Sequence, residues 1–313
     1  MRARAAECEW RRRIQGAFWI EDRIVTQVCG YIGAGMMGAP MVRRLLAAGT
    51  DVRLWARTPE KIHDLVKAGA KLAASPAELC RQADVVITCV SDTQAMRSVV
   101  FDRDGLAEGA ASPKILVDMS TISPQLTIEM AGRLHAETGM IWIDAPVSGG
   151  QVGAVNGTLA VMAGGPADAI DKVRPVLAHL ARAVTRVGDS GAGQYVKMLN
   201  QTLVSTTYLM VAEVLNFAER MGVDAAAVPE ALRGGHGDSN LLQQIWPKML
   251  ARDFTVTGTL DTLMKDLGMV RGIAQERAAP MPLNALVAEM IRKRIQDGHG
   301  QDDVSSLFKL YAS

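Results

Sequence analysis

The chain carries almost no net charge and has no long hydrophobic run, and each absence excludes a class of protein. Its 34 lysines and arginines nearly balance 33 acidic residues, which gives a formal net charge of +1 at pH 7. A nearly neutral chain offers no global field that would favour nucleic acid or an anionic membrane. No apolar run reaches the ~20 residues that a bilayer-spanning helix requires. We therefore expect no nucleic-acid partner and no membrane span.

Cysteine is scarce, and its spacing fits neither a disulfide framework nor a redox motif. The four cysteines form no CxxC pair, and two of them lie in strand-like apolar runs; they are Cys8, Cys29, Cys80 and Cys89. This usage favours a reduced, cytoplasmic setting. The five histidines are scattered, and no cluster of histidine, cysteine and aspartate has metal-ligand spacing. We therefore expect no metal site.

The first 24 residues do not read as part of a domain. The segment MRARAAECEWRRRIQGAFWIEDRI contains six arginines and four acids and lacks the clean apolar core of a secretory signal. We interpret residues 1–24 as a loosely attached or non-native extension. The alternatives are an added helix that packs on the body or on a partner subunit, and an Arg-rich transit peptide, against which the acids argue.

Short apolar runs alternate with amphipathic segments from residue 25 to residue 189. The runs predict strands, and the amphipathic segments between them predict helices closed by glycine or started by proline. The predicted strands are 26–33, 51–56, 83–90, 114–120, 140–146, 158–165 and 183–188, and the predicted helices are 39–49, 59–69, 93–100, 123–137 and 166–181. This alternation predicts an α/β fold with a doubly wound, mainly parallel Rossmann sheet.

The pattern changes to helix alone after Gly188. Residues 193–222 read as one long helix without proline, and the rest reads as helical segments broken by proline and glycine, with no strand pattern. A chain of 313 residues is long enough for two domains. We predict a dinucleotide-binding domain at 25–189 and an all-helical substrate and dimerisation domain at 190–313.

A glycine-rich turn lies between the first predicted strand and the first predicted helix. In GYIGAGMMGAP, Gly33 allows a tight turn, Gly35 lets the backbone approach a pyrophosphate, and Gly38 lets helix and strand pack closely. The helix that begins near Met37 would direct its first N–H groups at the phosphates. A bare turn is the alternative. We predict that the turn binds a dinucleotide through Gly33, Ala34, Gly35, Met36, Met37 and Gly38.

The residues at the end of the second predicted strand determine whether NAD or NADP is preferred. An acid there binds the ribose hydroxyls of NAD, and this chain has Ala56, followed by Arg57, Thr58 and Lys61. A guanidinium and a hydroxyl are better suited to bind the 2′-phosphate of NADP than the free pair of ribose hydroxyls of NAD. The alternative is that these are solvated surface charges. We therefore predict NADP as the cofactor, with NAD possible.

Three further stretches are candidates for chemistry. Lys197, Asn200 and Gln201 share one helix face, where a partly dry lysine would have a lowered pKa and could exchange a proton with a substrate oxygen held by the amides. Ser148, Gly149 and Gly150 end a strand, so their amides and hydroxyl could bind a carboxylate, or form only a flexible turn. Lys265 stands among apolar neighbours, where a snorkelling surface lysine is the alternative.

These stretches together resemble one family. GYIGAGMMGAPMVRRLLAAG, DMSTISP, DAPVSGGQVGAVNGTLAVMAGG, GAGQYVKMLNQ, KDLGMV and GHGQDDVSSLFKLY occur in that order from about residue 28 to the C-terminus. The chain resembles the β-hydroxyacid dehydrogenase family, which includes 3-hydroxyisobutyrate dehydrogenase, tartronate semialdehyde reductase and L-threonate dehydrogenase.

The resemblance implies roles for individual residues. Lys197 matches the family's catalytic lysine, and Ser148, Gly149 and Gly150 match its substrate-carboxylate turn. The cofactor contacts that it implies are Val90, Thr121 and Lys265. Gln201 stands where the family often has asparagine, with Asn200 one residue earlier, which leaves the substrate open.

The implied reaction is hydride transfer between NAD(P)(H) and a small β-hydroxyacid or its semialdehyde, with Lys197 as general acid and base. The candidate substrates are of the 3-hydroxyisobutyrate, tartronate semialdehyde, succinic semialdehyde or glyoxylate class, and a homodimer or homotetramer is expected. The alternatives are an imine reductase, which usually lacks lysine at this position, and a non-catalytic dinucleotide-binding scaffold. A 6-phosphogluconate dehydrogenase would have a much longer helical domain.

Overall fold

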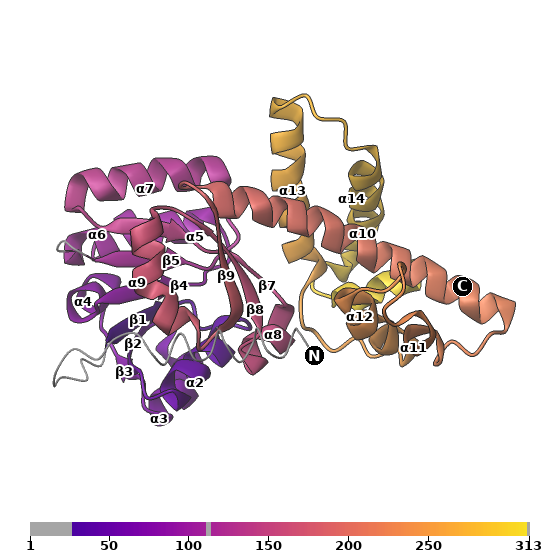
Figure 1. Cartoon of the computed structure of the whole chain (residues 1–313), viewed down its shortest axis with the longest axis horizontal. Coiled ribbons are helices and arrows are strands. Elements are labelled where there is room, and N and C mark those ends of the chain that lie inside the picture. Colours follow the sequence, from indigo (N-terminus) through magenta and orange to yellow (C-terminus); the bar gives the residue numbers. More distant parts are fainter. Residues whose placement is uncertain (1–26, 111–113, 312–313) are drawn as a thin grey trace.

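A nine-stranded sheet leads into a helical part in the computed structural model, which describes residues 27–110 and 114–311 (Figure 1). The strands lie in the order β3-β2-β1-β4-β5-β6-β8-β7, with β9 beside β8. Their bounds are β1 Val28–Ile32, β2 Asp51–Trp55, β3 Lys71–Leu72, β4 Val85–Thr88, β5 Ile115–Asp118, β6 Ile141–Asp144, β7 Val147–Ser148, β8 Leu159–Gly164 and β9 Ala181–Gly188. The prediction for residues 1–24 lies outside the described residues.

The first six strands form a Rossmann sheet. Every neighbouring pair in the run β3-β2-β1-β4-β5-β6 is parallel. Successive strands from β1 to β3 are added towards one edge of the sheet, and those from β4 to β6 are added towards the other edge. The strand order therefore reverses between β1 and β4, where dinucleotides bind in this fold. The predicted α/β class and the mainly parallel sheet are confirmed.

Helices cover both faces of the sheet. One hydrophobic cluster joins it to α2 (Gly38–Ala47), α3 (His63–Lys67), α8 (Gly150–Asn156) and α9 (Ala167–Leu177). A second cluster joins the other face to α4 (Pro76–Gln82), α5 (Thr93–Phe101), α6 (Leu106–Gly109) and α7 (Pro124–Thr138). A short 3-10 helix, η1 (Pro59–Ile62), precedes α3. Each predicted strand and helix before residue 189 coincides with one of these elements.

Several short elements were absent from the prediction. Strands β3 and β7 have two residues each, which is too short for an alternating pattern to be visible. β8 runs antiparallel to β6 and β7, so the end of the sheet is mixed. The glycine-rich segment after Ser148 was expected to be a turn, and it forms the seven-residue helix α8.

The helical part is built around one long helix, as predicted. α10 (Ala192–Met221) is followed by α11 (Val228–Leu232), α12 (Asn240–Leu250), α13 (Leu260–Glu276), α14 (Pro282–Arg294), η2 (Ile295–His299) and η3 (Val304–Leu310). A third hydrophobic cluster, centred on the fully buried Trp246, joins these helices. From residue 189 to residue 311 the only β-type pairing is an isolated bridge between Thr259 and Asp303.

α10 connects the two parts, and Asp144 fixes its start. Asp144 ends β6, and its carboxylate accepts hydrogen bonds from the backbone N–H of Gly191 at 2.7 Å and of Gln194 at 3.0 Å. Gly191 precedes the helix with φ of +87°, a conformation that favours glycine. In Figure 1, α10 leaves the sheet and crosses the helical part. Among the described helices, none has the length and apolar character to cross a membrane.

Candidate active site

The glycine turn lies between β1 and α2, and sterics require glycine at two of its positions. Gly33 has φ of +96°, and a Cβ on it would overlap the carbonyl oxygen of Cys89 at the end of β4. A Cβ on Gly38 would overlap the carbonyl oxygen of Gly33. The turn therefore packs tightly against the carboxyl ends of β1 and β4.

The same turn leaves room on its outer side. Gly35 is exposed, with nothing within 4 Å of an added Cβ, and Met36 beside it is 43% exposed. Met37 precedes α2, and no side chain caps this helix. The first N–H groups of an uncapped helix favour an anion. The residues present thus fit the pyrophosphate of a dinucleotide.

Arg57, Thr58 and Lys61 lie on the surface just after β2. All three are exposed, and among the described residues no side-chain partner is present for Arg57 or Lys61. Thr58 precedes η1 without making a side-chain cap. Two cations and a hydroxyl at this edge of the sheet suit a phosphate on the adenosine ribose.

Lys197 extends from α10 to β7, so its ammonium joins the helical part to the sheet. It is 7% exposed, and its Nζ donates to the carbonyl oxygen of Val147 and to Oε1 of Gln201, each at 2.8 Å. Burial lowers the pKa of this lysine to about 8; the carboxylate of Asp266 opposes that shift, and the ammonium of Lys265 adds to it. An amine with this pKa can hold or release a proton near neutral pH.

Of the two amides after Lys197, Gln201 contacts the lysine directly, and Asn200 contacts Gln201. Oε1 of Gln201 also accepts from Asn200 Nδ2 at 2.9 Å, while Nε2 of Gln201 donates to Asp266 Oδ2 at 2.5 Å. Gln201 thus links the lysine to a carboxylate that is 2% exposed. In this arrangement the Gln201 amide orients Lys197, whereas its expected contact with substrate stays a prediction.

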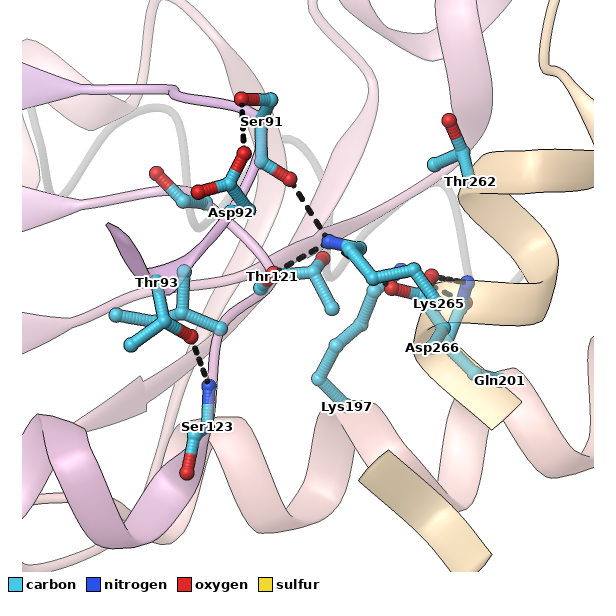
Figure 2. Close-up of polar contacts among 12 residues, drawn as sticks. Ser91, Asp92, Thr93, Thr121, Ser123, Lys197, Gln201, Thr262, Lys265 and Asp266 are labelled. Carbon is cyan, nitrogen blue, oxygen red and sulfur yellow. Dashed lines mark hydrogen bonds and ion pairs between the residues drawn. The ribbon is translucent and has the colours of Figure 1, made fainter. Parts of the chain in front are cut away.

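Lys265 joins the helical part to the strand ends. From α13, its Nζ donates to the carbonyl oxygens of Ser91 at 2.9 Å and Thr121 at 2.8 Å, and it pairs with Asp266 at 3.2 Å (Figure 2). The alternative of a snorkelling surface lysine is therefore wrong. Val90, next to Ser91, donates its N–H to Ser120 Oγ, so the half-buried Val90 and Thr121 lie on adjacent loops.

The turn at Ser148, Gly149 and Gly150 lies beside the lysine. Lys197 binds the carbonyl of Val147, the residue before Ser148. Gly149 and Gly150 have φ of +127° and +60° and lead directly into α8. The structure therefore brings the predicted carboxylate turn, Lys197 and Gln201 into one connected cluster.

Asp266 is the site residue that sequence reasoning missed. It follows Lys265 in KDLG, but its partner Gln201 lies 65 positions away in sequence. A buried acid on an amphipathic helix was the available signal. The described residues contain no group of three or more histidine, cysteine, aspartate or glutamate side chains arranged to hold a metal ion.

Two family models match the chain, one on each part. Residues 28–188 match the NAD binding domain of 6-phosphogluconate dehydrogenase, and residues 191–311 match the NAD-binding region of NADP-dependent 3-hydroxyisobutyrate dehydrogenase. The boundary between the two matches falls between the end of β9 at Gly188 and the start of α10 at Ala192.

Named relatives agree with the models. L-threonate dehydrogenase of Cupriavidus necator is 36% identical over 90% of this chain and 95% of its own length. 2-Hydroxy-3-oxopropionate reductase of Escherichia coli is 33% identical over 89% and 94%. The crystal structure of 3-hydroxyisobutyrate dehydrogenase from Salmonella typhimurium superposes with a TM-score of 0.82 at 30% identity, covering 91% and 99%. The chain therefore belongs to the β-hydroxyacid dehydrogenase family, as an NAD(P)-dependent oxidoreductase that acts on the CH–OH group of hydroxyacids.

Proposed function

We propose that the protein interconverts a small β-hydroxyacid and its semialdehyde, with NADP(H) as the preferred cofactor and Lys197 as general acid and base. The bound dinucleotide supplies or accepts the hydride. In oxidation, the neutral amine of Lys197 takes the proton of the substrate hydroxyl. In reduction, its ammonium returns that proton to the carbonyl oxygen.

One observation carries this proposal. Lys197 of α10 is buried, and its ammonium donates a hydrogen bond to the carbonyl oxygen of Val147 on β7, the residue before Ser148. A cation placed beside the turn at Ser148, Gly149 and Gly150 favours a small substrate with a carboxylate near the reacting oxygen. Ser148, Gly149 and Gly150 would bind that carboxylate, and Asn200 would face the rest of the substrate.

The first test identifies the substrate. The purified enzyme is assayed with NADPH or NADH against glyoxylate, succinic semialdehyde, tartronate semialdehyde and methylmalonate semialdehyde, with a cyclic imine as the contrasting substrate. We expect turnover of at least one semialdehyde or oxoacid. Turnover of the imine alone would favour the imine reductase alternative, and binding of NADPH without any turnover would favour the non-catalytic scaffold.

The second test concerns the nucleotide. The exposed Arg57 and Lys61 support recognition of a 2′-phosphate. We predict that Arg57→Ala weakens NADPH binding about tenfold or more and leaves NADH binding nearly unchanged, because one charge-assisted contact is worth ~1.5–3 kcal/mol. Fluorescence titration of both cofactors measures this. Arg182→Ala, an exposed arginine on β9, is the matched control; equal losses for the two cofactors would show that Arg57 does not contact the phosphate.

The remaining expectations concern assembly and location. We propose a homodimer or homotetramer, as expected from the sequence. We also propose a cytoplasmic setting, which the free thiols of Cys29, Cys80 and Cys89 support.

A further inference from the structure

The loop between β5 and α7, residues 119–123, is held by one side chain of α10. Gln194 lies in the first turn of that helix and is fully buried. Its Nε2 donates to the carbonyl oxygen of Ser120 at 2.9 Å, and its Oε1 accepts from the backbone N–H of Ile122 at 3.2 Å. Both ends of one amide are therefore bound to the same loop, on either side of Thr121.

The backbone of this loop leaves one N–H group free. Four of its N–H groups donate to acceptors on β4, β5, α5 or α10, namely those of Met119, Ser120, Ile122 and Ser123. Within the described part of the chain, no partner is present for the N–H or the hydroxyl of Thr121. Its carbonyl oxygen accepts from Lys265 at 2.8 Å (Figure 2). Thr121 is half-buried, so its N–H and hydroxyl are left for a ligand.

The same turn of α10 carries the candidate acid and base. Gln194 and Lys197 lie three residues apart, so both side chains leave the same side of the helix. Lys197 reaches Val147 on β7, while Gln194 reaches the loop after β5. The turn is itself fixed, because Asp144 accepts the backbone N–H of Gln194 at 3.0 Å. One helical turn therefore sets the distance between the buried amine and Thr121.

The amide of Gln194 provides a restraint that an apolar side chain would not. A buried amide is costly unless its hydrogen bonds are made, and methionine would fill a similar volume without that cost. Lys265 contacts the loop at the carbonyl oxygen of Thr121, and its side chain is 30% exposed. A contact at one atom restrains a distance, whereas the two bonds of Gln194 also restrain the direction in which the loop faces.

We propose that Gln194 is a positioning residue for the reaction. It holds residues 119–123 so that the N–H and hydroxyl of Thr121 meet the nicotinamide end of the dinucleotide at a fixed distance from Lys197. Gln194 itself touches neither substrate nor cofactor. The inference rests on the proposed function, in which the hydride and the proton of Lys197 reach adjacent atoms of the substrate. A misplacement of ~1 Å in such an arrangement can cost ~10²-fold in rate.

Gln194→Met tests this role, because methionine has a similar size and forms neither bond. At saturating substrate and cofactor, kcat should fall ~10²-fold. NADPH should bind about threefold more weakly or worse, since the placement of a hydrogen-bonding contact is lost. ADP-ribose 2′-phosphate, which lacks the nicotinamide, should bind as it does to the parent. Isothermal titration calorimetry measures both ligands; if NADH binds more tightly than NADPH, then NADH and ADP-ribose take their place.

Gln194→Glu provides a second test, which also serves if Gln194→Met does not fold. When protonated, the introduced carboxyl can donate to Ser120 and accept from Ile122 as the amide does. When ionised, it sets an oxygen against the carbonyl oxygen of Ser120. The rate of reduction by this variant, divided by the parental rate at the same pH, should therefore rise as the pH falls from 9 to 6.

The charged groups beside this position do not produce that trend by themselves. The carboxyl of Asp144, which is bonded to the backbone N–H of Gln194, disfavours ionisation of the introduced acid. An ionised carboxyl would favour the ammonium of Lys197, one turn away, and this effect would raise the rate ratio at high pH instead.

Ser205→Ala is the matched control. Ser205 is fully buried on α10, and its hydroxyl donates within the helix to the carbonyl oxygen of Thr202. This variant should keep the parental kcat and the parental affinity for both nucleotides.

Three results would overturn the proposal. They are a parental kcat in Gln194→Met, an equal loss of affinity for NADPH and ADP-ribose 2′-phosphate, which indicates a purely structural role, and a rate ratio for Gln194→Glu that does not change with pH. If the parent binds NADPH but turns over none of the candidate substrates, the proposed function fails. The comparison of the two nucleotides then still decides whether Gln194 places Thr121 at the nicotinamide.

Discussion

Lys197 is the residue on which the chemistry depends, and its surroundings set its charge. Its ammonium lies between Val147 and Gln201, away from water, which lowers its pKa to about 8. A base for hydroxyacid oxidation must be neutral, and an acid for carbonyl reduction must be protonated. Oxidation should therefore gain rate as pH rises through about 8, and reduction should lose it over the same range.

Asp266 and Lys265 shift that pKa in opposite directions, which gives a paired prediction. The carboxylate of Asp266 raises the pKa of Lys197 and the ammonium of Lys265 lowers it. Asp266→Asn should therefore move the midpoint of the oxidation profile to lower pH, and Lys265→Met should move it to higher pH. The measurement is kcat/KM for oxidation from pH 6 to pH 10 at saturating cofactor. Shifts of the same sign in both variants would contradict the proposed electrostatics.

At the residue scale, the sequence predicted Lys197 and Gln201 as site residues but not Asp266. Lys197 and Gln201 were identified because four residues on a helix place side chains on one face. Asp266 was missed because its contact with Gln201 joins two helices that are far apart in sequence. Periodicity reports which face of a helix is apolar, whereas the crossing of two helices decides which polar side chains meet.

Among the elements, α10 depends on a strand that ends far earlier in the chain. Asp144 at the end of β6 accepts the N–H groups of Gly191 and Gln194, and burial raises the pKa of its carboxyl even though these bonds lower it. No local sequence signal predicts that the start of α10 is fixed by Asp144, which lies 47 positions before Gly191. The long helix was predictable from its uninterrupted pattern, while the placement of its first turn was not.

This contact predicts a change in stability. Asp144→Ala leaves two buried N–H groups without an acceptor, which costs ~1–3 kcal/mol each. Asp144→Asn retains one amide oxygen and should cost less. Urea unfolding followed by circular dichroism measures the free energy of unfolding of both variants. Equal stability of Asp144→Ala and the parent protein would show that α10 is positioned by packing alone.

Other elements illustrate the same limit. Most strands and helices of the Rossmann sheet followed the alternation of apolar and amphipathic segments, because they are long enough to show its period. The short elements β3, α4 and α6 were not predicted. β7 and α8 did not follow this alternation, since a two-residue strand has no period and a glycine-rich helix resembles a turn. Yet β7 provides the carbonyl of Val147 that binds Lys197.

At the scale of the whole molecule, a buried carboxylate ties the helical part together. Asp303, with no exposed surface, accepts hydrogen bonds from Lys248, Ser305 and the N–H of Thr257. Burial alone would raise its pKa, but these bonds outweigh burial and lower it to about 2. They link α12, the loop before α13 and the start of η3.

The sign of that shift predicts how stability depends on pH. The folded-state pKa lies below the unfolded value of ~3.9, so Asp303 stabilises the fold above about pH 4, and that contribution is lost as pH falls towards 2. A shift of about two units corresponds to ~2–3 kcal/mol. Asp303→Asn should therefore lower the free energy of unfolding near neutral pH, and the deficit should shrink in acid. Denaturant titrations at pH 7 and pH 3 make the comparison; a deficit of the same size at both would exclude this linkage.

The most direct test of the central claim is Lys197→Met, assayed for turnover and for NADPH binding in the same preparation. Loss of one proton-transfer group should lower kcat by ~10²–10⁴-fold, while the dissociation constant for NADPH and the melting temperature stay close to those of the parent. Lys293→Met, an exposed lysine on α14, should retain full activity. Turnover by Lys197→Met at the parental rate would contradict the account, because the buried ammonium would then have no part in the reaction.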